Sequence, residues 1–150
     1  SHAMTLKPAA TTPAPGTPSA ASALGHWPVK LRLIPETAPF LQGASLLLLA
    51  DCAAAASPTL HRQFLPGRVV ALACPKFEER SANAAKLARI LHEAGIRDLT
   101  VVEMEVPCCG GLSSLAAQAL GQATSTIPDR RVILARDGSV RSEEPLAPTL

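Results

Sequence analysis

The chain has few aromatic residues: no tyrosine, one tryptophan and three phenylalanines among its 150 residues. Its core must therefore consist of leucine, valine and alanine, as is typical of helices packed on a parallel sheet. Apolar residues still make up 47% of the sequence, and this length is that of one domain with a substantial core.

The sequence also lacks a strong charge excess and any long apolar run. Its formal net charge is +2 and no long basic run is present, which gives no electrostatic case for binding nucleic acid or an anionic membrane. Apolar runs such as 46–50 are far too short to span a bilayer. No charged segment followed by an apolar one opens the chain, so we expect a cytoplasmic protein whose thiols stay reduced.

Several catalytic signatures are missing as well. There is no phosphate loop, no dinucleotide fingerprint after the first expected strand and no Gly-x-Ser-x-Gly elbow. We find no catalytic pair of carboxylates and assign no catalytic residue. Enzymatic activity stays open, and these absences favour a non-catalytic protein.

Strand and helix patterns alternate through the middle of the chain. This predicts an α/β fold, a Rossmann-like three-layer sandwich with right-handed crossovers and a mostly parallel sheet of about five strands. The expected strands are 29–33, 46–50, 68–73, 99–106 and 131–135, and the expected helices are 58–65, 77–94 and 112–123.

We expect one domain, residues 26–142, between two tails. Residues 1–25 are predicted to be a disordered tail, because 5–25 are mostly Ala, Pro, Thr, Ser and Gly; residues 1–4 read as a cloning remnant. The proline-rich tail 143–150 is predicted to be loose. Asp137-Gly138 marks a tight turn, after which 139–141 are expected to pair back as a short hairpin.

All four cysteines of the chain follow expected strands. Cys52 follows 46–50, with a small-residue loop expected at 53–56, Cys74 follows 68–73, and Cys108 and Cys109 follow 99–106. If these strands are parallel, their carboxyl ends meet at one edge of the sheet, where open α/β folds build binding sites. Soft sulfur ligands select zinc, copper(I) or iron–sulfur centres. The pattern therefore predicts a site of four thiolates.

The neighbours of the double cysteine suit an inorganic centre. Gly110-Gly111 lets the backbone approach a bulky group, and the amino terminus of the following helix lowers the pKa of nearby thiols. Neither zinc-finger pairs nor a compact ferredoxin run is present. Because the ligands come from three strand ends, cofactor binding and folding should be coupled.

Other interpretations stay open at this point. The four sulfurs could hold zinc, Cys108 and Cys109 could form a redox-active thiol pair, and some cysteines could be inert core residues. Asp51, Glu105 and Lys76 border the expected site and could tune it by charge. His61 is more often a surface or capping residue than a ligand at such a position. His26 and His92 read as surface residues.

The Cys-Cys-Gly-Gly element resembles the CCG domain of heterodisulfide reductase B subunits and related iron–sulfur oxidoreductase subunits. In that family another cysteine lies a few tens of residues upstream of the pair, the place that Cys74 takes here. The family's downstream C-x-x-C is missing from this chain. Without this C-x-x-C, the resemblance does not imply the specialised non-cubane cluster or the disulfide-reducing chemistry of that family.

A wider resemblance covers residues 26–141. It is to small proteins of anaerobic and microaerobic microbes described as 4Fe-4S ferredoxins or iron–sulfur cluster-binding proteins. The matching segments are Trp27-Pro28-Val29-Lys30-Leu31, 39–44, Ala50-Asp51-Cys52, 60–65, Ala73-Cys74-Pro75-Lys76 and 104–111.

The resemblance implies one [4Fe-4S] cluster bound by Cys52, Cys74, Cys108 and Cys109, with Gly110 and Gly111 against it. The expected role is electron transfer or redox sensing. One cluster cannot hold two electrons, so a partner redox protein or a homodimer is implied. The alternatives are a thiol/disulfide oxidoreductase or CCG-type enzyme subunit, and a zinc-stabilised interaction module.

Overall fold

The computed structural model describes residues 3–6 and 21–146. Its centre is a five-stranded sheet in the order β4-β3-β5-β6-β7. Strands β3 (Ser45–Ala50), β4 (Arg68–Ala73), β5 (Asp98–Met104) and β6 (Asp129–Leu134) are parallel, and β7 (Val140–Glu144) runs antiparallel to β6. The prediction of a mostly parallel five-stranded sheet is confirmed.

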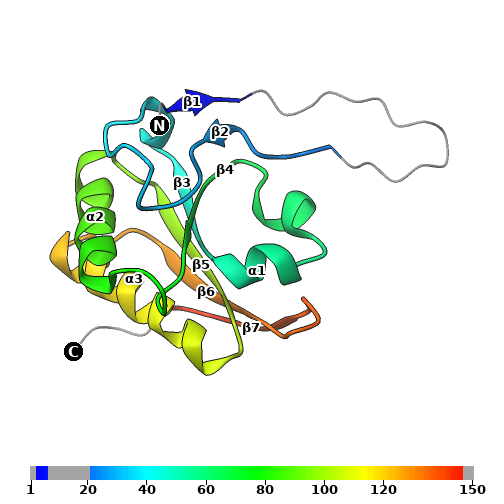
Figure 1. Cartoon of the computed structure of the whole chain (residues 1–150). Coiled ribbons are helices and arrows are strands. Elements are labelled where there is room, and N and C mark those ends of the chain that lie inside the picture. The colour runs from blue at the N-terminus through cyan, green and yellow to red at the C-terminus, as the bar shows by residue number, and fades with distance from the viewer. Residues whose placement is uncertain (1–2, 7–20, 147–150) are drawn as a thin grey trace.

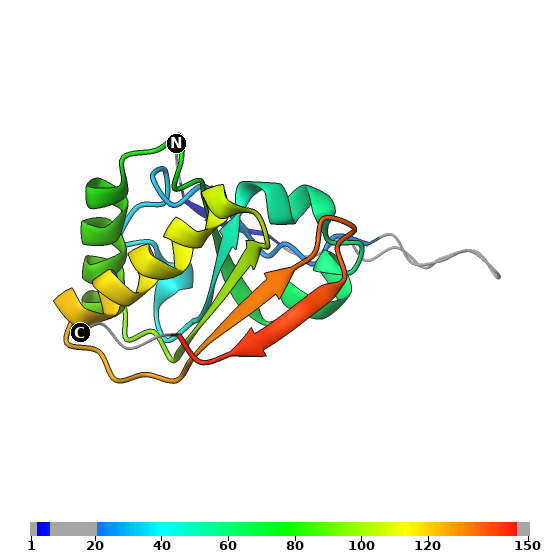
Figure 2. The same ribbon diagram turned by 90° about the horizontal axis from the view of Figure 1, so that it is seen from below.

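Helices cover both faces of this sheet. α1 (Asp51–Ala56) and a π-helical turn, η2 (Leu60–Phe64), connect β3 to β4; α2 (Arg80–Glu93) connects β4 to β5, and α3 (Gly110–Gln122) connects β5 to β6. α2 and α3 lie side by side on one face, and α1 lies on the other (Figures 1 and 2). The predicted three-layer sandwich is thus confirmed. No helix within 3–6 and 21–146 has the length and apolarity needed to cross a membrane.

The connections create a switch point beside the central strand. β4 lies on one side of β3 and β5 on the other, so the chain changes its direction of travel across the sheet after β4. Right-handed crossovers then place α1 and α2 on opposite faces. The carboxyl ends of β3 and β5 consequently lie at the position where open α/β sheets bind ligands.

β3 is the most deeply buried strand, as its unbroken apolar run predicts. Leu46, Leu47, Leu48 and Leu49 point alternately to the two faces, and each is at most 1% exposed. Both faces of a central parallel strand are covered by helices, so none of these positions needs a polar side chain.

The prediction of an edge strand at 29–33 is wrong, because the structure forms only one isolated bridge there, between Lys30 and Leu72. The Leu72 amide donates to the Val29 carbonyl at 2.8 Å, and the Leu31 amide donates to the Leu72 carbonyl at 2.8 Å. The chain then turns, because the Ile34 amide bonds back to the Lys30 carbonyl at 3.1 Å. Leu31 and Ile34 enter the core while Leu33 stays 52% exposed, which breaks the alternation that suggested a strand.

The small-residue loop expected at 53–56 is also wrong, because these residues belong to α1. Cys52 therefore lies in the first turn of a helix. Alanine has the highest helix propensity, and a run of four alanines needs only one packed face to stay helical. Ala53 supplies that face and is fully buried.

The two predicted tails are partly ordered. β1 (Met4–Thr5) pairs antiparallel with β2 (His26–Trp27), so residues 4 and 5 are not disordered; residues 7–20 lie outside the described ranges. At the other end β7 continues to Glu144, and the Leu146 amide donates to Asp129 Oδ1 at 3.1 Å. The loose tail predicted from 143 is wrong up to 146, and 147–150 are not described.

His26 is buried, at 1% exposure, so its assignment to the surface is wrong. Its Nε2 accepts the Val70 amide at 2.9 Å, and Nδ1 lies 3.1 Å from the Pro28 carbonyl, to which it donates in that tautomer. Val70 is on the edge strand β4, whose amide would otherwise lack a partner in the interior. The ring also packs on Phe40 with 4.6 Å between centroids.

This burial predicts a pH-dependent stability. Desolvation lowers the pKa of His26 in the folded chain below its ordinary value of 6.5, against the opposing effect of the Pro28 carbonyl. As the pH falls below 6.5, the unfolded chain binds a proton that the folded chain resists, so stability decreases until the folded pKa is reached. Urea unfolding should show a lower midpoint at about pH 5.5 than at about pH 7.5. His26→Gln should lose much of this difference and exposed His92→Gln should keep it; equal behaviour of the two variants would contradict the assignment.

Candidate functional site

The sheet order places all four cysteines along one edge. Cys74 follows β4, Cys52 follows β3, and Cys108 and Cys109 lie in a 3-10 turn, η3 (Pro107–Cys109), that follows β5. These three strands are adjacent and parallel, so their carboxyl ends share the edge that the sequence predicted. All four thiols are free.

Three of these thiols interact with one another. Cys109 is buried at 4% exposure, whereas Cys52 and Cys108 are exposed and Cys74 is half-buried. Burial raises the pKa of the Cys109 thiol, and proximity to Cys108 and Cys52 raises it further, while the Met104 backbone opposes the shift. For Cys109, burial and the two neighbouring cysteines thus oppose the lowering of the pKa that we expect from a helix amino terminus.

The Cys74 loop approaches the same turn from the other side of the edge. A β-carbon placed on Gly111 would lie 3.1 Å from Pro75 Cβ and 3.4 Å from Arg80 Cζ. A β-carbon here would force Pro75 and Arg80 to shift, so the glycine allows α3 to begin this close to the loop. Gly110, by contrast, faces open space, with nothing within 4 Å of its β-carbon position. The two glycines thus have different roles, one in packing and one in leaving room.

The thiols do not form a preassembled site for a single ion. Within residues 3–6 and 21–146, no group of three or more His, Cys, Asp or Glu side chains is placed to hold a metal ion. The cysteines share an edge, and three of them interact, but any cofactor would have to bind across the ends of several strands.

An ion network connects the start of α1, which carries Cys52, with the loop that follows Cys74. Lys30 Nζ lies 2.9 and 2.8 Å from the two carboxylate oxygens of Asp51, and it also pairs with Glu78. Glu78 in turn accepts the Asn83 side-chain amide at 3.0 Å and the Cys74 backbone amide at 3.2 Å. Burial would raise the pKa of Glu78, but Lys30, Asn83 and the Cys74 amide outweigh it and lower that pKa.

Removing the Lys30 ammonium group should lower the free energy of unfolding. Lys30→Met leaves the 9%-exposed Glu78 side chain without its counter-ion, and we expect a loss of about 1–2 kcal/mol in unfolding free energy. The loss is below that of a fully buried pair because Lys30 and Asp51 are 29% and 38% exposed. Arg89→Met, which breaks the exposed pair with Glu36, is the matched control and should change stability little. Urea unfolding measures both, and equal small losses would show that the Lys30 network does not hold the loops.

The remaining predicted residues have other surroundings. Glu105 pairs with Arg141 at 3.1 Å, and Lys76 is exposed. His61 is exposed on η2, and its Nδ1 accepts a hydrogen bond from the Ala23 amide at 3.1 Å. This contact ties η2 to the segment before β2. His92 is exposed as expected.

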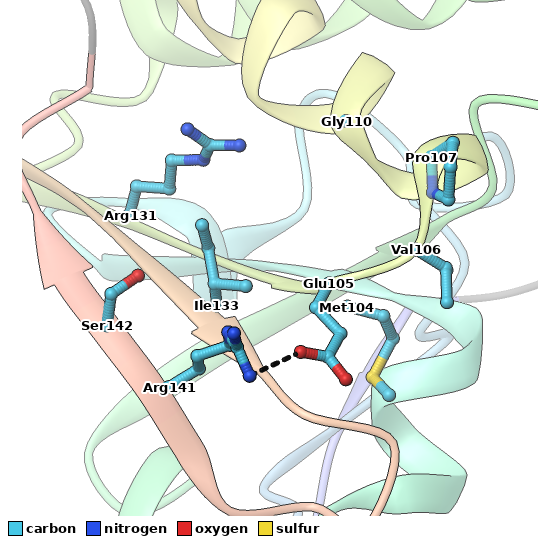
Figure 3. Close-up of a pocket in the computed structure, with 9 residues that line it drawn as sticks. All are labelled: Met104, Glu105, Val106, Pro107, Gly110, Arg131, Ile133, Arg141 and Ser142. Atoms are coloured by element: carbon cyan, nitrogen blue, oxygen red, sulfur yellow. Dashed lines mark ion pairs between the residues drawn. The ribbon is translucent and has the colours of Figure 1, made fainter.

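A cavity of about 510 Å³ lies beside the double-cysteine turn. Figure 3 shows Arg141 and Glu105 pointing toward one another in it, with Arg131 reaching from β6. Next to the cavity, Glu103 is fully buried, pairs with Arg131 and accepts the Ser113 hydroxyl at 2.5 Å, while its Oε2 has no hydrogen-bond partner within the described residues.

Sequence reasoning missed Lys30, Glu78, Arg80 and Glu103. For Glu103 a signal existed in the sequence. Residues 99–104 are apolar except for Thr100 and Glu103, and Glu103 is the only charged residue among them. Lys30 and Glu78 are 48 positions apart and no spacing rule connects them.

The sheet and the place of its thiols define the class: a doubly wound α/β protein with a candidate site at the carboxyl ends of its parallel strands. The chain belongs to a family of Rossmann-like domains, whose model it matches over residues 38–149. It is also 30% identical over 115 residues to an uncharacterized protein of Archaeoglobus fulgidus, an alignment that covers 77% of this chain and 81% of that protein. No solved structure matches it significantly.

Proposed function

We propose that this chain binds one [4Fe-4S] cluster through Cys52, Cys74, Cys108 and Cys109 and serves in electron transfer or redox sensing. The observation that carries the proposal is the position of every cysteine in the chain at the carboxyl edge of three adjacent parallel strands. Inert core cysteines would have no reason to gather at one edge, and two of these four are exposed to solvent.

The spread of the ligands favours a cluster over a single ion. Neighbouring strands lie about 4.8 Å apart, so β4 and β5, with β3 between them, are separated by about 10 Å. Tetrahedral zinc with bonds of about 2.3 Å would need its sulfurs about 4 Å from one another. A cluster offers each thiolate its own iron and accepts ligands that are farther apart.

The surrounding residues suit such a centre. When bound, a [4Fe-4S] cluster supplies one-electron transfer. Its four thiolates bring negative charge, which Arg80 beside Gly111 can offset. Gly110 leaves space at the turn, and the Met104 backbone interacts with the Cys109 sulfur.

Reduction of protein purified without oxygen tests this role. We expect a brown protein with broad absorbance near about 400 nm that bleaches on addition of dithionite and then gives a paramagnetic signal. A colourless protein with stoichiometric zinc would support the interaction module instead. A colourless, metal-free protein with one rapidly alkylated thiol would support a thiol oxidoreductase, with exposed Cys108 as the attacking group.

A further inference from the structure

Phe77 is a large apolar side chain that the fold leaves in water. It lies in the loop after Cys74 and is 87% exposed, whereas Phe64 is buried and Phe40 is half-buried. Burying a phenylalanine side chain is favourable, and this surface forgoes that gain. One exposed apolar side chain is common on protein surfaces, so Phe77 marks a docking site only together with the residues around it.

The loop holds Phe77 in place. Its neighbour Glu78 is fixed by Lys30, by Asn83 and by the Cys74 amide, and the Glu78 amide donates back to the Cys74 carbonyl at 3.2 Å. The ring is therefore presented by a structured loop, and little conformational entropy remains to be lost when a partner covers it.

Positive charge predominates around this ring, with four cations near it. Arg32 and Lys86 line a groove of about 350 Å³ together with Phe77, and Lys76 and Arg80 are exposed next to Phe77 in sequence. The groove also includes Glu79 and two residues that are ion-paired elsewhere, Glu78 with Lys30 and Arg89 with Glu36. None of these four cations has an ion-pair partner within 3–6 and 21–146. We name this set the Phe77 surface: Arg32, Lys76, Phe77, Arg80 and Lys86.

We propose that the Phe77 surface is the docking site of a redox protein with an acidic face. An apolar anchor within a ring of charge is how transient protein contacts combine affinity with fast association. The surface carries four cations in a chain whose net charge is only +2, so the complementary face is acidic.

The inference rests on the proposed function, because Phe77 lies three residues from the cluster ligand Cys74. The docked partner is oxidised by one electron as the cluster is reduced by one, and no bond is formed or broken. The Cys74 loop is then the route by which the electron reaches the cluster.

Rates of reduction test the surface. The reductants are a purified acidic flavodoxin in its hydroquinone state and, in parallel, dithionite, which needs no docking surface. With flavodoxin we expect the second-order rate constant of the wild type to fall between about 50 and 200 mM salt. Phe77→Ala and Arg32→Glu should each lower it about tenfold at low salt.

Two control variants lie elsewhere on the molecule. Val140→Ala removes an apolar side chain that is 41% exposed on β7, and Arg97→Glu reverses an exposed charge before β5, at the opposite edge of the sheet. Both should stay within about twofold of the wild type, and dithionite should reduce all variants equally. If flavodoxin reduces Phe77→Ala and Arg32→Glu like the wild type, the docking site is wrong while the cluster stands. A protein without a dithionite-reducible cluster would overturn the proposed function, and this inference with it.

Discussion

Cys109→Ser should remove most of the iron from protein prepared without oxygen. Cys109 is the buried thiol that interacts with both Cys108 and Cys52, so it lies where the ligands from β3 and β5 converge. A serine oxygen is a hard, weakly acidic ligand that iron–sulfur centres accept poorly. We expect at least about a tenfold drop in iron per chain, a size typical of damage to a metal site, measured together with absorbance near 400 nm. Ser114→Ala, at an exposed position on α3, is the control and should keep its iron.

The other three cysteines extend this series. Cys52→Ser and Cys108→Ser should behave like Cys109→Ser, since both thiols lie close enough to Cys109 to raise its pKa. Cys74→Ser is the sharpest case, because the loop after Cys74 reaches the site by packing on Gly111, and Cys74 is not among the thiols that raise the pKa of Cys109. If Cys74→Ser retains full iron, the four-cysteine ligand set is wrong and three cysteines suffice.

Gly138→Ala should destabilise the fold by about 2–4 kcal/mol, from backbone strain and overpacking together. Gly138 has a φ of +88°, and a β-carbon there would lie 2.1 Å from the Ala56 carbonyl oxygen and 2.5 Å from Pro58 Cδ. The Asp137-Gly138 turn between β6 and β7 is thus pressed against the end of α1, so the clash involves backbone that cannot rotate away.

Gly67→Ala separates strain from packing. Gly67 has a similar φ of +73°, but nothing lies within 4 Å of its β-carbon position. Gly67→Ala should lower the free energy of unfolding only by the cost of backbone strain, about 1 kcal/mol. Urea unfolding of both variants gives the comparison, and equal losses would mean that the hairpin turn does not pack on α1 as closely as the structure shows.

The sheet could be predicted because its signals are local. The unbroken run at 46–50 marks a strand covered on both faces, and the cysteine after each strand end follows from the same pattern. Once the strands are parallel, their carboxyl ends must share an edge, so the sequence predicts the edge on which the cysteines lie. That β4, β3 and β5 are neighbours depends on the strand order, which the sequence does not show.

The supporting interactions could not be predicted, because they depend on that order. Lys30 contacts Glu78 only because the segment after β2 lies along the free edge of β4, and this arrangement also buries His26 against Val70. The alternation of Val29, Leu31 and Leu33 indicated a strand, yet a turn at Lys30 sends Ile34 into the core instead.

The prediction of a loop after Cys52 was wrong for a related reason. Four alanines next to a strand end read equally well as a loop or as a short helix, and the packing of Ala53 decides for the helix. Cys52 consequently projects from the first turn of α1, beside Asp51 and its partner Lys30.

The central claim is that one iron–sulfur cluster joins the ends of β4, β3 and β5, and metal analysis of the wild type addresses it most directly. Iron, acid-labile sulfide and zinc are measured per chain on protein prepared without oxygen. The account predicts about four iron atoms and four sulfides with no zinc. One zinc per chain, or iron without sulfide, would contradict it.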